Sequence, residues 1–245
     1  IAANLQARGV QPGDHVGLYL PTAPETAALI HALARIGAVQ VPLNRRLTSA
    51  ELAWQISDAD CHLMIVDSPI EALDVTCDQL PLHELLHETS NTAITHFALD
   101  NVHAIFYTSG TTGRPKGAML TFANHQASTL GTTDRLGVTD DDRWLLCMPL
   151  YHIGGQSILL RAAQYGIPVV LQDGFDPDET YRMLRDERVT FVSLVPTMLH
   201  RLLPLIERNG LPQHLRVILL GGAAASTDLI EAAHRLDLPI ALTYG

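Results

Sequence analysis

The sequence has few cysteines, no long apolar run and no block of basic residues, and each absence narrows the class of protein. The cysteines Cys61, Cys77 and Cys147 form no C-x-x-C pair. Neither a disulfide framework nor a cysteine zinc site is therefore expected, and a reducing cytoplasm fits best. No apolar stretch reaches the ~18 residues of a membrane-spanning helix, and the first residues lack the features of a secretory leader. We expect a soluble cytoplasmic protein without an integral membrane segment.

The charge balance argues against a general affinity for polyanions. The formal net charge is −10 and the pI is about 5.5, and Lys and Arg do not gather into a run. No nucleic-acid partner is expected, and an anionic substrate would need a local site. With 245 residues, of which 47% are hydrophobic, the chain can bury a substantial core in one large or two smaller domains. A homo-oligomer remains open.

Apolar runs rich in Val, Ile and Leu alternate with segments of helical period, a pattern typical of helices packed on largely parallel sheets. The predicted fold is therefore α/β, with layered sheets and packed helices. In the first part of the chain, a capping box formed by Thr48 and Glu51 predicts a helix that ends near residue 58. The other elements predicted there are a helix ending near Gly9, strands at 15–20, 39–41 and 62–66, and a helix at 23–35.

The periodicity fades between residues 67 and 100, where we predict an irregular linker. Beyond it, a strand at 102–107 is predicted to lead directly into a glycine-rich loop, and a helix at 122–136 follows with Thr121 as its N-cap. Further strands are predicted at 144–148, 169–171, 191–194, 217–220 and 240–243. We expect one α/β subdomain in residues 1–100 and a second, carrying the loop, in residues 101–245.

The glycine-rich loop YTSGTTGRPKG, residues 107–117, has the composition of a polyphosphate site. Its glycines allow the backbone to bend and approach a ligand, its hydroxyl groups can donate to phosphate oxygens, and its lysine can neutralise charge. These residues are Gly110, Gly113 and Gly117, then Ser109, Thr111 and Thr112, and finally Lys116. The spacing differs from the GxxxxGK[ST] loop of P-loop NTPases, which are disfavoured. The plainer alternative is a surface turn that binds nothing.

All eleven positions of this loop agree with the signature of the adenylate-forming superfamily, which includes acyl-CoA synthetases, luciferases and peptide-synthetase adenylation domains. The chain resembles the large N-terminal domain of an acyl-CoA synthetase, and MPLYHIGG, LVPTM, LLGGAA and TYG occur in family order. The resemblance implies that a carboxylate attacks the α-phosphate of ATP, that pyrophosphate leaves, and that the thiol of coenzyme A then takes the acyl group. It implies ATP, Mg²⁺, coenzyme A and a small carboxylic acid as ligands.

The resemblance also implies roles for particular residues. Thr108 and Lys116 would be catalytic, with Lys116 stabilising the departing pyrophosphate by its charge. The implied phosphate contacts are Thr108, Ser109, Gly110, Thr111, Thr112, Gly113, Lys116 and Gly117. The implied adenine contacts are Gly221, Gly222, Ala223 and Tyr244, and the implied acyl-pocket residues are His152, Gly154, Gly155 and Thr197. No metal ligand is implied in this chain beyond the magnesium of MgATP.

Several of these residues also have structural explanations. His152 could be an ordinary histidine at the end of a strand. The segment GGAAAS, 221–226, could be a strand-to-helix turn with Ser226 as N-cap, and Thr197 could simply follow Pro196 at a helix start.

Two short patterns suggest metal sites but have simpler explanations. HELLH, residues 83–87, would suit a zinc metalloprotease if it lay on a helix. It follows Pro81 in the least periodic region without a clear third ligand, so an exposed helical turn is favoured. The run Asp140, Asp141 and Asp142 resembles a magnesium ligand set, but a solvated turn before the strand at Trp144 is favoured.

Residues 148–203 most resemble the 2-succinylbenzoate–CoA ligases of menaquinone synthesis, on the segments MPLYHIGGQSILLRAAQYG, GFDPDETYRML and VSLVPTMLHRLL. A medium-chain fatty acyl- or aryl-CoA synthetase is the alternative. The sequence does not identify the basic residue that would hold a second carboxylate. The ends of the chain look like those of a fragment, and family members continue past the position of Gly245 into a small C-terminal domain. The chain by itself is expected to be inactive, and a nucleotide-binding module without turnover is the alternative from another class.

Overall fold

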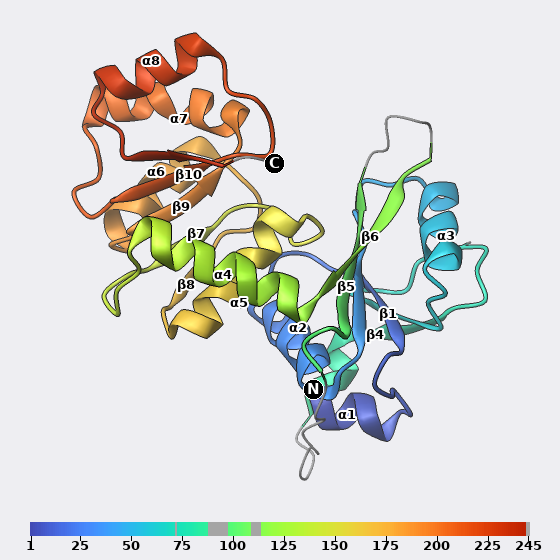
Figure 1. The fold of residues 1–245 in the computed structure, drawn as a ribbon. Coiled ribbons are helices and arrows are strands. Elements are labelled where there is room, and N and C mark those ends of the chain that lie inside the picture. Colours follow the sequence, from blue (N-terminus) through green and yellow to red (C-terminus); the bar gives the residue numbers. More distant parts are fainter. Residues whose placement is uncertain (72, 88–97, 109–113, 244–245) are drawn as a thin grey trace. The chain divides into compact units, whose positions relative to one another are not determined.

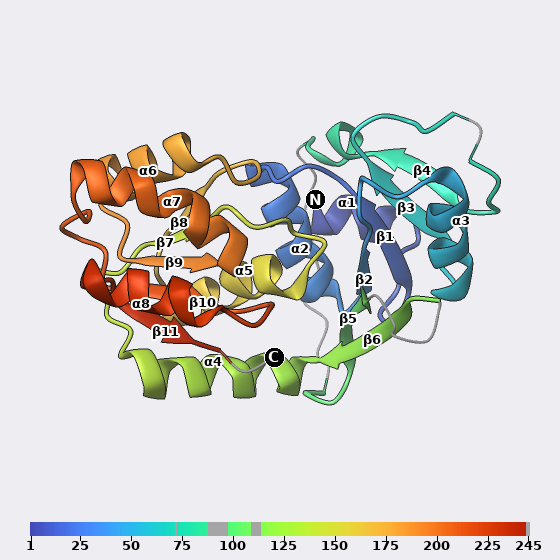
Figure 2. The same ribbon diagram turned by 90° about the horizontal axis from the view of Figure 1, so that it is seen from above.

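The computed structural model describes residues 1–71, 73–87, 98–108 and 114–243. The chain divides into two compact units, Ile1–Ser128 and Thr129–Gly245, and each has a sheet of its own (Figures 1 and 2). The predicted α/β fold with layered sheets and packed helices is confirmed.

The first unit contains a six-stranded sheet in the order β4-β3-β1-β2-β5-β6. Strands β1 to β5 run parallel, and β6 pairs antiparallel with β5. Its elements are α1 (Ala2–Ala7), β1 (His15–Tyr19), α2 (Pro24–Ile36), β2 (Val39–Pro42), α3 (Ser49–Asp58), β3 (Leu63–Val66), β4 (Asp78–Pro81), η1 (Leu82–Leu85), β5 (Val102–Thr108) and β6 (Lys116–Thr121).

Helices cover both faces of this sheet (Figure 1). On one face, α3 buries Leu52 and Ile56 in a core cluster with Val41 of β2 and Met64 of β3. Helices α1 and α2 lie on the other face. The alternation of side chains along each strand supplies both cores, as expected for parallel strands buried on two sides.

The second unit contains a five-stranded parallel sheet in the order β11-β10-β9-β7-β8. Helices α6, α7 and α8 pack on one core cluster with β7, β9 and β10, and α5 packs on β7 and β8. Its elements are β7 (Trp144–Leu146), α5 (Ile153–Tyr165), β8 (Val169–Leu171), α6 (Pro177–Asp186), β9 (Phe191–Leu194), α7 (Pro196–Asn209), β10 (Val217–Leu220), α8 (Thr227–Arg235) and β11 (Ile240–Leu242).

The predicted helix starts are confirmed. At the start of α3, Glu51 N donates to Thr48 Oγ1 (3.3 Å) and Thr48 N donates to Glu51 Oε2 (2.8 Å), which makes the capping box. Thr121 Oγ1 accepts from Asn124 N (3.2 Å) at the start of α4 (Phe122–Leu136), the helix in which the boundary between the units falls.

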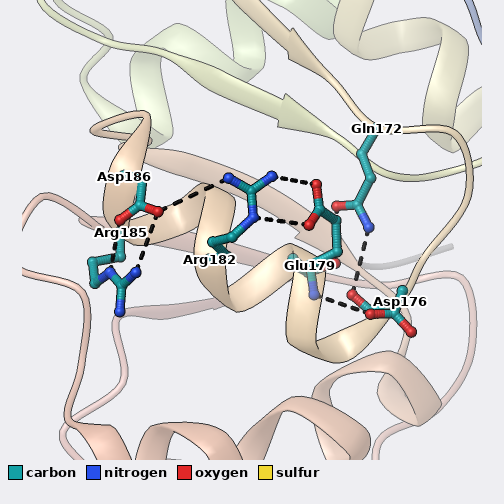
Figure 3. Close-up of polar contacts among 7 residues, drawn as sticks. Gln172, Asp176, Glu179, Arg182, Arg185 and Asp186 are labelled. Atoms are coloured by element: carbon teal, nitrogen blue, oxygen red, sulfur yellow. Dashed lines mark hydrogen bonds and ion pairs between the residues drawn. The ribbon is translucent and has the colours of Figure 1, made fainter.

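The segment GFDPDETYRML begins α6 through a polar network (Figure 3). Asp176 is the N-cap and accepts from Glu179 N at 3.0 Å, while Pro177 occupies the first turn. Gln172, before the helix, donates to the carbonyl oxygen of Asp176 (3.5 Å). Arg182 binds Glu179 and Asp186 on the exposed side of the helix. These contacts explain the segment as a helix start.

Two strands were not predicted. β4 lies within the predicted linker, where its sequence DQLP is short and polar because it forms the edge of the sheet. A sheet edge also tolerates its Pro81. β6, KGAMLT, is the other edge strand, and it is exposed along most of its length, so neither strand has the pattern of a buried element.

The division of the chain also differs from the predicted one at residues 100/101. β5 pairs with β2, and β6 pairs with β5, so both belong to the sheet of the first unit. The boundary between the compact units consequently lies between Ser128 and Thr129. The glycine-rich loop therefore extends from the first unit.

The HELLH segment has a structural role. Only Leu82–Leu85 is helical, as a 3₁₀ turn, so the two histidines do not share an α-helical face. Asn4 of α1 donates to the carbonyl oxygens of Leu85 and His87, each at 2.9 Å. Among the described residues, no group of three or more His, Cys, Asp or Glu side chains is placed to hold a metal ion.

The prediction of a wholly solvated turn at 140–142 was wrong for Asp142. Its carboxylate is 1% exposed and accepts from Arg216 Nε and Nη2, both at 2.6 Å, and from Thr139 N at 2.7 Å. Burial alone would raise the pKa of Asp142, but the hydrogen bonds from Arg216 and Thr139 bring that pKa below its ordinary value. Asp142 thus joins the turn before β7 to the segment before β10.

Candidate functional site

The glycine-rich loop connects two antiparallel strands, and we call β5, β6 and this loop the phosphate hairpin. In its register Thr108 lies opposite Lys116, and Tyr107 lies opposite Gly117. Thr108 Oγ1 donates to the carbonyl oxygen of Lys116 (3.5 Å), and both residues are exposed. The two predicted catalytic residues are thus brought together at the base of the loop. Ser109, Gly110, Thr111, Thr112 and Gly113 lie outside the described residues.

This hairpin differs from the strand–loop–helix arrangement that the sequence suggested. Six residues of β6 separate the loop from the start of α4 at Phe122. The N-terminus of α4 therefore does not supply the dipole that helps a P-loop hold phosphate. Any phosphate at this loop would depend on the loop amides, its hydroxyl groups and Lys116.

Composition gives an additional reason to single out Lys116. It is the only lysine in the 245 residues, against fifteen arginines. An arginine would be the expected cation on composition alone, so the use of a compact ammonium here points to a specific requirement. This signal is visible in the sequence and strengthens the assignment of Lys116.

The base of the phosphate hairpin is fixed by α3. Tyr107 Oη donates to Asp58 Oδ2 (2.7 Å) and is also 3.2 Å from the carbonyl oxygen of Gln55. Burial and then the hydrogen bond to Asp58 raise the pKa of Tyr107, so the phenol stays protonated as a donor. A Cβ added at Gly117 would come within 3.4 Å of Tyr107 Cζ, so the tyrosine ring leans over the glycine.

The other predicted site residues belong to the second unit, at the ends of its parallel strands. We call the ends of β7, β9, β10 and β11, with the residues that follow them, the carboxyl edge (Figure 2). Gly221 N donates to the carbonyl oxygen of Leu194 (3.1 Å), and Thr243 N donates to that of Leu220 (2.9 Å). The segments after β9, β10 and β11 are thereby joined side by side. Open α/β sheets commonly bind ligands at such an edge.

Packing accounts for the two glycines after β10. A Cβ on Gly221 would collide with Thr243 Oγ1, and one on Gly222 would meet Val195 Cγ1 at 3.1 Å. Gly222 also has φ +76°, a conformation that favours glycine. Ala223 is exposed beside them. Tyr244, the predicted adenine-stacking residue, lies outside the described residues.

His152 is the N-cap of α5, and its side chain makes no capping hydrogen bond. Its ring packs against that of Tyr151 with centroids 4.5 Å apart, and partial burial lowers the pKa of His152. The lowered pKa favours the neutral imidazole at pH 7. A neutral, partly apolar ring at the carboxyl edge suits the lining of an acyl pocket.

The neighbouring glycines differ in their surroundings. A Cβ on Gly155 would overlap the backbone carbonyl oxygen of Pro149, whereas one on Gly154 would meet only the end of the Met148 side chain, at 2.9 Å. Gly155 is thus needed for α5 to start close to the segment that follows β7, whether or not a ligand is bound. Thr197 is exposed in the first turn of α7 after Pro196, which agrees with its structural explanation.

The predicted site residues accordingly form two sets. Thr108, Lys116 and Gly117 belong to the first unit, and the histidine, glycine, alanine and threonine residues of the carboxyl edge belong to the second. Within the described part of the chain, no helix has the length and apolar character needed to cross a membrane.

Comparison with known sequences places this geometry in a family. The sequence profile of the AMP-binding enzymes matches residues 1–245. The chain is 38% identical over 247 residues to the 2-succinylbenzoate–CoA ligase of Bacillus cereus (strain Q1), covering 100% of this chain and 51% of that protein. The ligase of the same name from Bacillus cytotoxicus is also 38% identical, with the same coverage. The chain spans about half the length of the curated relatives it matches.

Solved structures agree. The O-succinylbenzoate coenzyme A synthetase (MenE) of Bacillus subtilis in complex with AMP has a TM-score of 0.92 at 33% identity, over 100% of this chain and 64% of that chain. The N-terminal domain of FACL13 from Mycobacterium tuberculosis has a TM-score of 0.90 at 25% identity, over 100% and 65%. The fold, the loop signature and the profile match together show that the chain belongs to the AMP-binding enzyme family.

Proposed function

We propose that the protein is an ATP-dependent acid–thiol ligase that forms an acyl adenylate and then an acyl-CoA, with 2-succinylbenzoate as the acid. The observation that carries the proposal is the pair Thr108 and Lys116 at the base of the loop 107–117. Support comes from relatives named as 2-succinylbenzoate–CoA ligases and from B. subtilis MenE structures with ATP and magnesium and with the acyl adenylate OSB-AMP.

The chemistry requires charge control on the polyphosphate. A carboxylate oxygen of the acid forms a bond to the α-phosphorus of ATP, and the bond from that phosphorus to the bridging oxygen breaks. Pyrophosphate leaves with the bonding electrons and its added negative charge. The Lys116 ammonium, with the hydroxyl and amide groups of the loop, would stabilise that charge. Mg²⁺ would enter bound to the phosphates of ATP and would neutralise them further.

In the second step, the thiolate of coenzyme A attacks the acyl carbon, and AMP leaves. We assign the acyl pocket to His152, Gly154, Gly155 and Thr197, and the adenine contacts to Gly221, Gly222, Ala223 and Tyr244. The neutral imidazole of His152 would line the pocket without repelling or trapping the reacting carboxylate.

A dicarboxylate such as 2-succinylbenzoate also needs a cation for its second carboxylate. Arg161 of α5 does not meet this need, because its Cζ lies 5.8 Å from the ring centroid of Trp144, the first residue of β7. Its guanidinium therefore lies toward the amino ends of the parallel strands, away from the carboxyl edge where α5 begins at His152.

We place the reaction in the cytoplasm, because three buried free thiols fit a reducing compartment. The partners in this proposal are ATP, coenzyme A and the acid. The net charge of −10 argues against a nucleic-acid partner. A homo-oligomer is compatible with the proposal and is not required by it.

The test is release of pyrophosphate from ATP by the full natural polypeptide, measured with 2-succinylbenzoate, octanoate, benzoate or no acid. We expect release with 2-succinylbenzoate, and Lys116→Ala should lower the rate about 100-fold. Arg35→Ala is the matched control, because it also removes one positive charge from the first unit. Arg35 lies at the end of α2, and a helix that returns from one parallel strand to the next ends at the opposite edge of the sheet from the loop.

Each outcome decides a part of the proposal. Release with octanoate or benzoate in place of 2-succinylbenzoate would change the acid but keep the reaction. ATP binding without release for any acid would leave a nucleotide-binding module.

A further inference from the structure

Tyr107, at the start of the loop 107–117 (hereafter the phosphate loop), and Arg114, near its end, both contact one side chain of α3. Trp54 packs edge-on against Tyr107 with ring centroids 5.7 Å apart and an interplanar angle of 73°. The guanidinium of Arg114 lies over the Trp54 ring, with Cζ 5.8 Å from the ring centroid. Tyr107 directly precedes Thr108, and Arg114 stands two residues before Lys116. Trp54 therefore touches the neighbours of both predicted catalytic residues.

The rest of α3 reinforces this contact. Asp58 lies one helical turn beyond Trp54, so both side chains project from the same face of the helix. Asp58 accepts the Tyr107 hydroxyl at 2.7 Å while Trp54 meets the tyrosine ring. The Tyr107 ring is thus held by the hydrogen bond of its hydroxyl group and by its contact with the Trp54 ring. Because Tyr107 leans over Gly117, fixing the tyrosine also fixes the returning strand β6.

The energies are modest but act at the point where geometry matters. An edge-on aromatic pair and a cation–π contact at a partly exposed site each add a small stabilisation beyond the area that they bury. Neither is needed to form the sheet, which β5 and β6 make through backbone hydrogen bonds. Their effect is to restrict the separation and direction of the two ends of a loop that must surround a polyphosphate.

We propose that Trp54 is a positioning residue for the phosphate loop, acting through Tyr107 on the strand that enters the loop and through Arg114 on the segment that leaves it. The inference rests on the proposed function, since it assumes that this loop holds the β- and γ-phosphates of ATP. It assigns Trp54 no contact with the nucleotide.

The discriminating measurement compares ATP with AMP, because AMP lacks the two phosphates that the loop would hold. In the full natural polypeptide, Trp54→Ala should raise the Kd for ATP about tenfold and change the Kd for AMP less than about twofold. Trp54→Phe keeps an aromatic ring and should recover most of the ATP affinity. The change in tryptophan emission on adding ATP should be larger in the wild type than in Trp54→Phe.

Thr48→Ala is the matched control for the stability of α3. It removes the capping box but leaves the ring of Trp54 in place, so it should lower Tm without separating ATP from AMP. If Trp54→Ala does not fold, Arg114→Ala tests the same contact from an exposed side chain and should show the same selective loss for ATP.

The outcomes separate this inference from the proposed function. Wild-type protein that does not bind ATP would overturn both. Wild-type binding of ATP with unchanged affinity in Trp54→Ala, or with equal losses for ATP and AMP, would overturn only the positioning role. A Thr48→Ala variant with the same selective ATP loss would also overturn it, because helix stability alone would then explain the effect.

Discussion

The phosphate hairpin and the carboxyl edge are both loop regions at strand ends, but different forces hold them. Side chains of α3 fix the hairpin, through the hydroxyl bond of Tyr107 to Asp58 and the ring contact with Trp54. The carboxyl edge is joined by backbone hydrogen bonds from Gly221 and Thr243 and by glycines that admit close backbone approach. Substitutions in the hairpin should therefore lower activity with little loss of stability, whereas substitutions at the carboxyl edge should lower stability first.

The ion pairs of the two units give the largest expected contrast. Arg216→Met would leave the Asp142 carboxylate buried without its partner and should cost about 3 kcal/mol. Arg8→Met removes the partner of Glu84 in the first unit, where the two side chains are 38% and 46% exposed, and should cost less than about 1 kcal/mol. Urea unfolding of the two variants measures the difference.

A fall in pH should narrow this contrast, because the Asp142–Arg216 pair loses its stabilising effect. The folded-state pKa of Asp142 is lowered, so its stabilising effect is present above the unfolded pKa of about 4 and is lost as the pH falls through the folded value. Arg216→Met should then lose less stability than the wild type on acidification below pH 4. Equal costs for the two arginine variants at neutral pH would show that Asp142 is not effectively buried.

The glycines give the second contrast. Gly155→Ala would push a methyl group into the backbone carbonyl of Pro149 and should cost about 2–3 kcal/mol. Gly117→Ala would meet Ile105 Cγ2 at 2.9 Å, the end of a side chain that can move, and should cost less than about 1 kcal/mol. Thermal unfolding gives both values, and ATP affinity should instead be more sensitive at Gly117. A larger stability loss at Gly117 would reverse the comparison.

Acid sensitivity should come from the first unit through His103 at pH values where Asp142 is still ionised. Burial first, and then the charges of His125 and His31, lower the pKa of His103 to about 3. Gln40 Nε2 lies 3.0 Å from His103 Nε2, so the amide can donate to the neutral ring. Below pH 6.5 His103 binds a proton in the unfolded chain, whereas its ring stays neutral in the folded protein because its pKa there is lower. The free energy of unfolding therefore falls as the pH falls.

The expected loss from His103 is about 1.4 kcal/mol between pH 7.5 and 5.5. His103→Gln keeps a neutral hydrogen-bonding group that does not titrate, and it should lose less stability over that interval in urea unfolding. His234→Gln changes an exposed histidine of α8 and is the control. If His103→Gln has the same pH slope as the wild type, the proton is not taken up at this position.

The contrast between the regions also explains what the sequence could predict. Buried parallel strands such as β9 and β10 have apolar runs, and they were placed at their observed residues. Edge strands β4 and β6 were missed because an edge strand need not be apolar. The predicted site motifs rest on residue type and order, and they stay predictions. Asp142 was misread because its partner Arg216 is 74 residues away. Trp54 was missed for the same reason, since its contacts with Tyr107 and Arg114 form only in the fold.

The smallest expected contrast concerns two helix caps. Thr48→Ala removes a reciprocal capping box from α3 and should cost about 1 kcal/mol, whereas Ser226→Ala removes a single 3.3 Å bond to Leu229 N from α8 and should cost about 0.5 kcal/mol. Thermal unfolding measures both, with Thr48→Ser and Ser226→Thr as controls that keep a capping hydroxyl.

The two caps should also differ in their effect on function. α3 supports the phosphate hairpin only through side chains. A weakened cap should therefore lower the stability of α3 while Trp54 still contacts Tyr107. Ser226 ends the segment 221–226 that begins with Gly221 and Gly222, so loss of its cap would loosen the carboxyl edge itself. A larger loss of ATP affinity in Thr48→Ala than in Ser226→Ala would show that the hairpin depends on the stability of α3 and would weaken the distinction between the two regions.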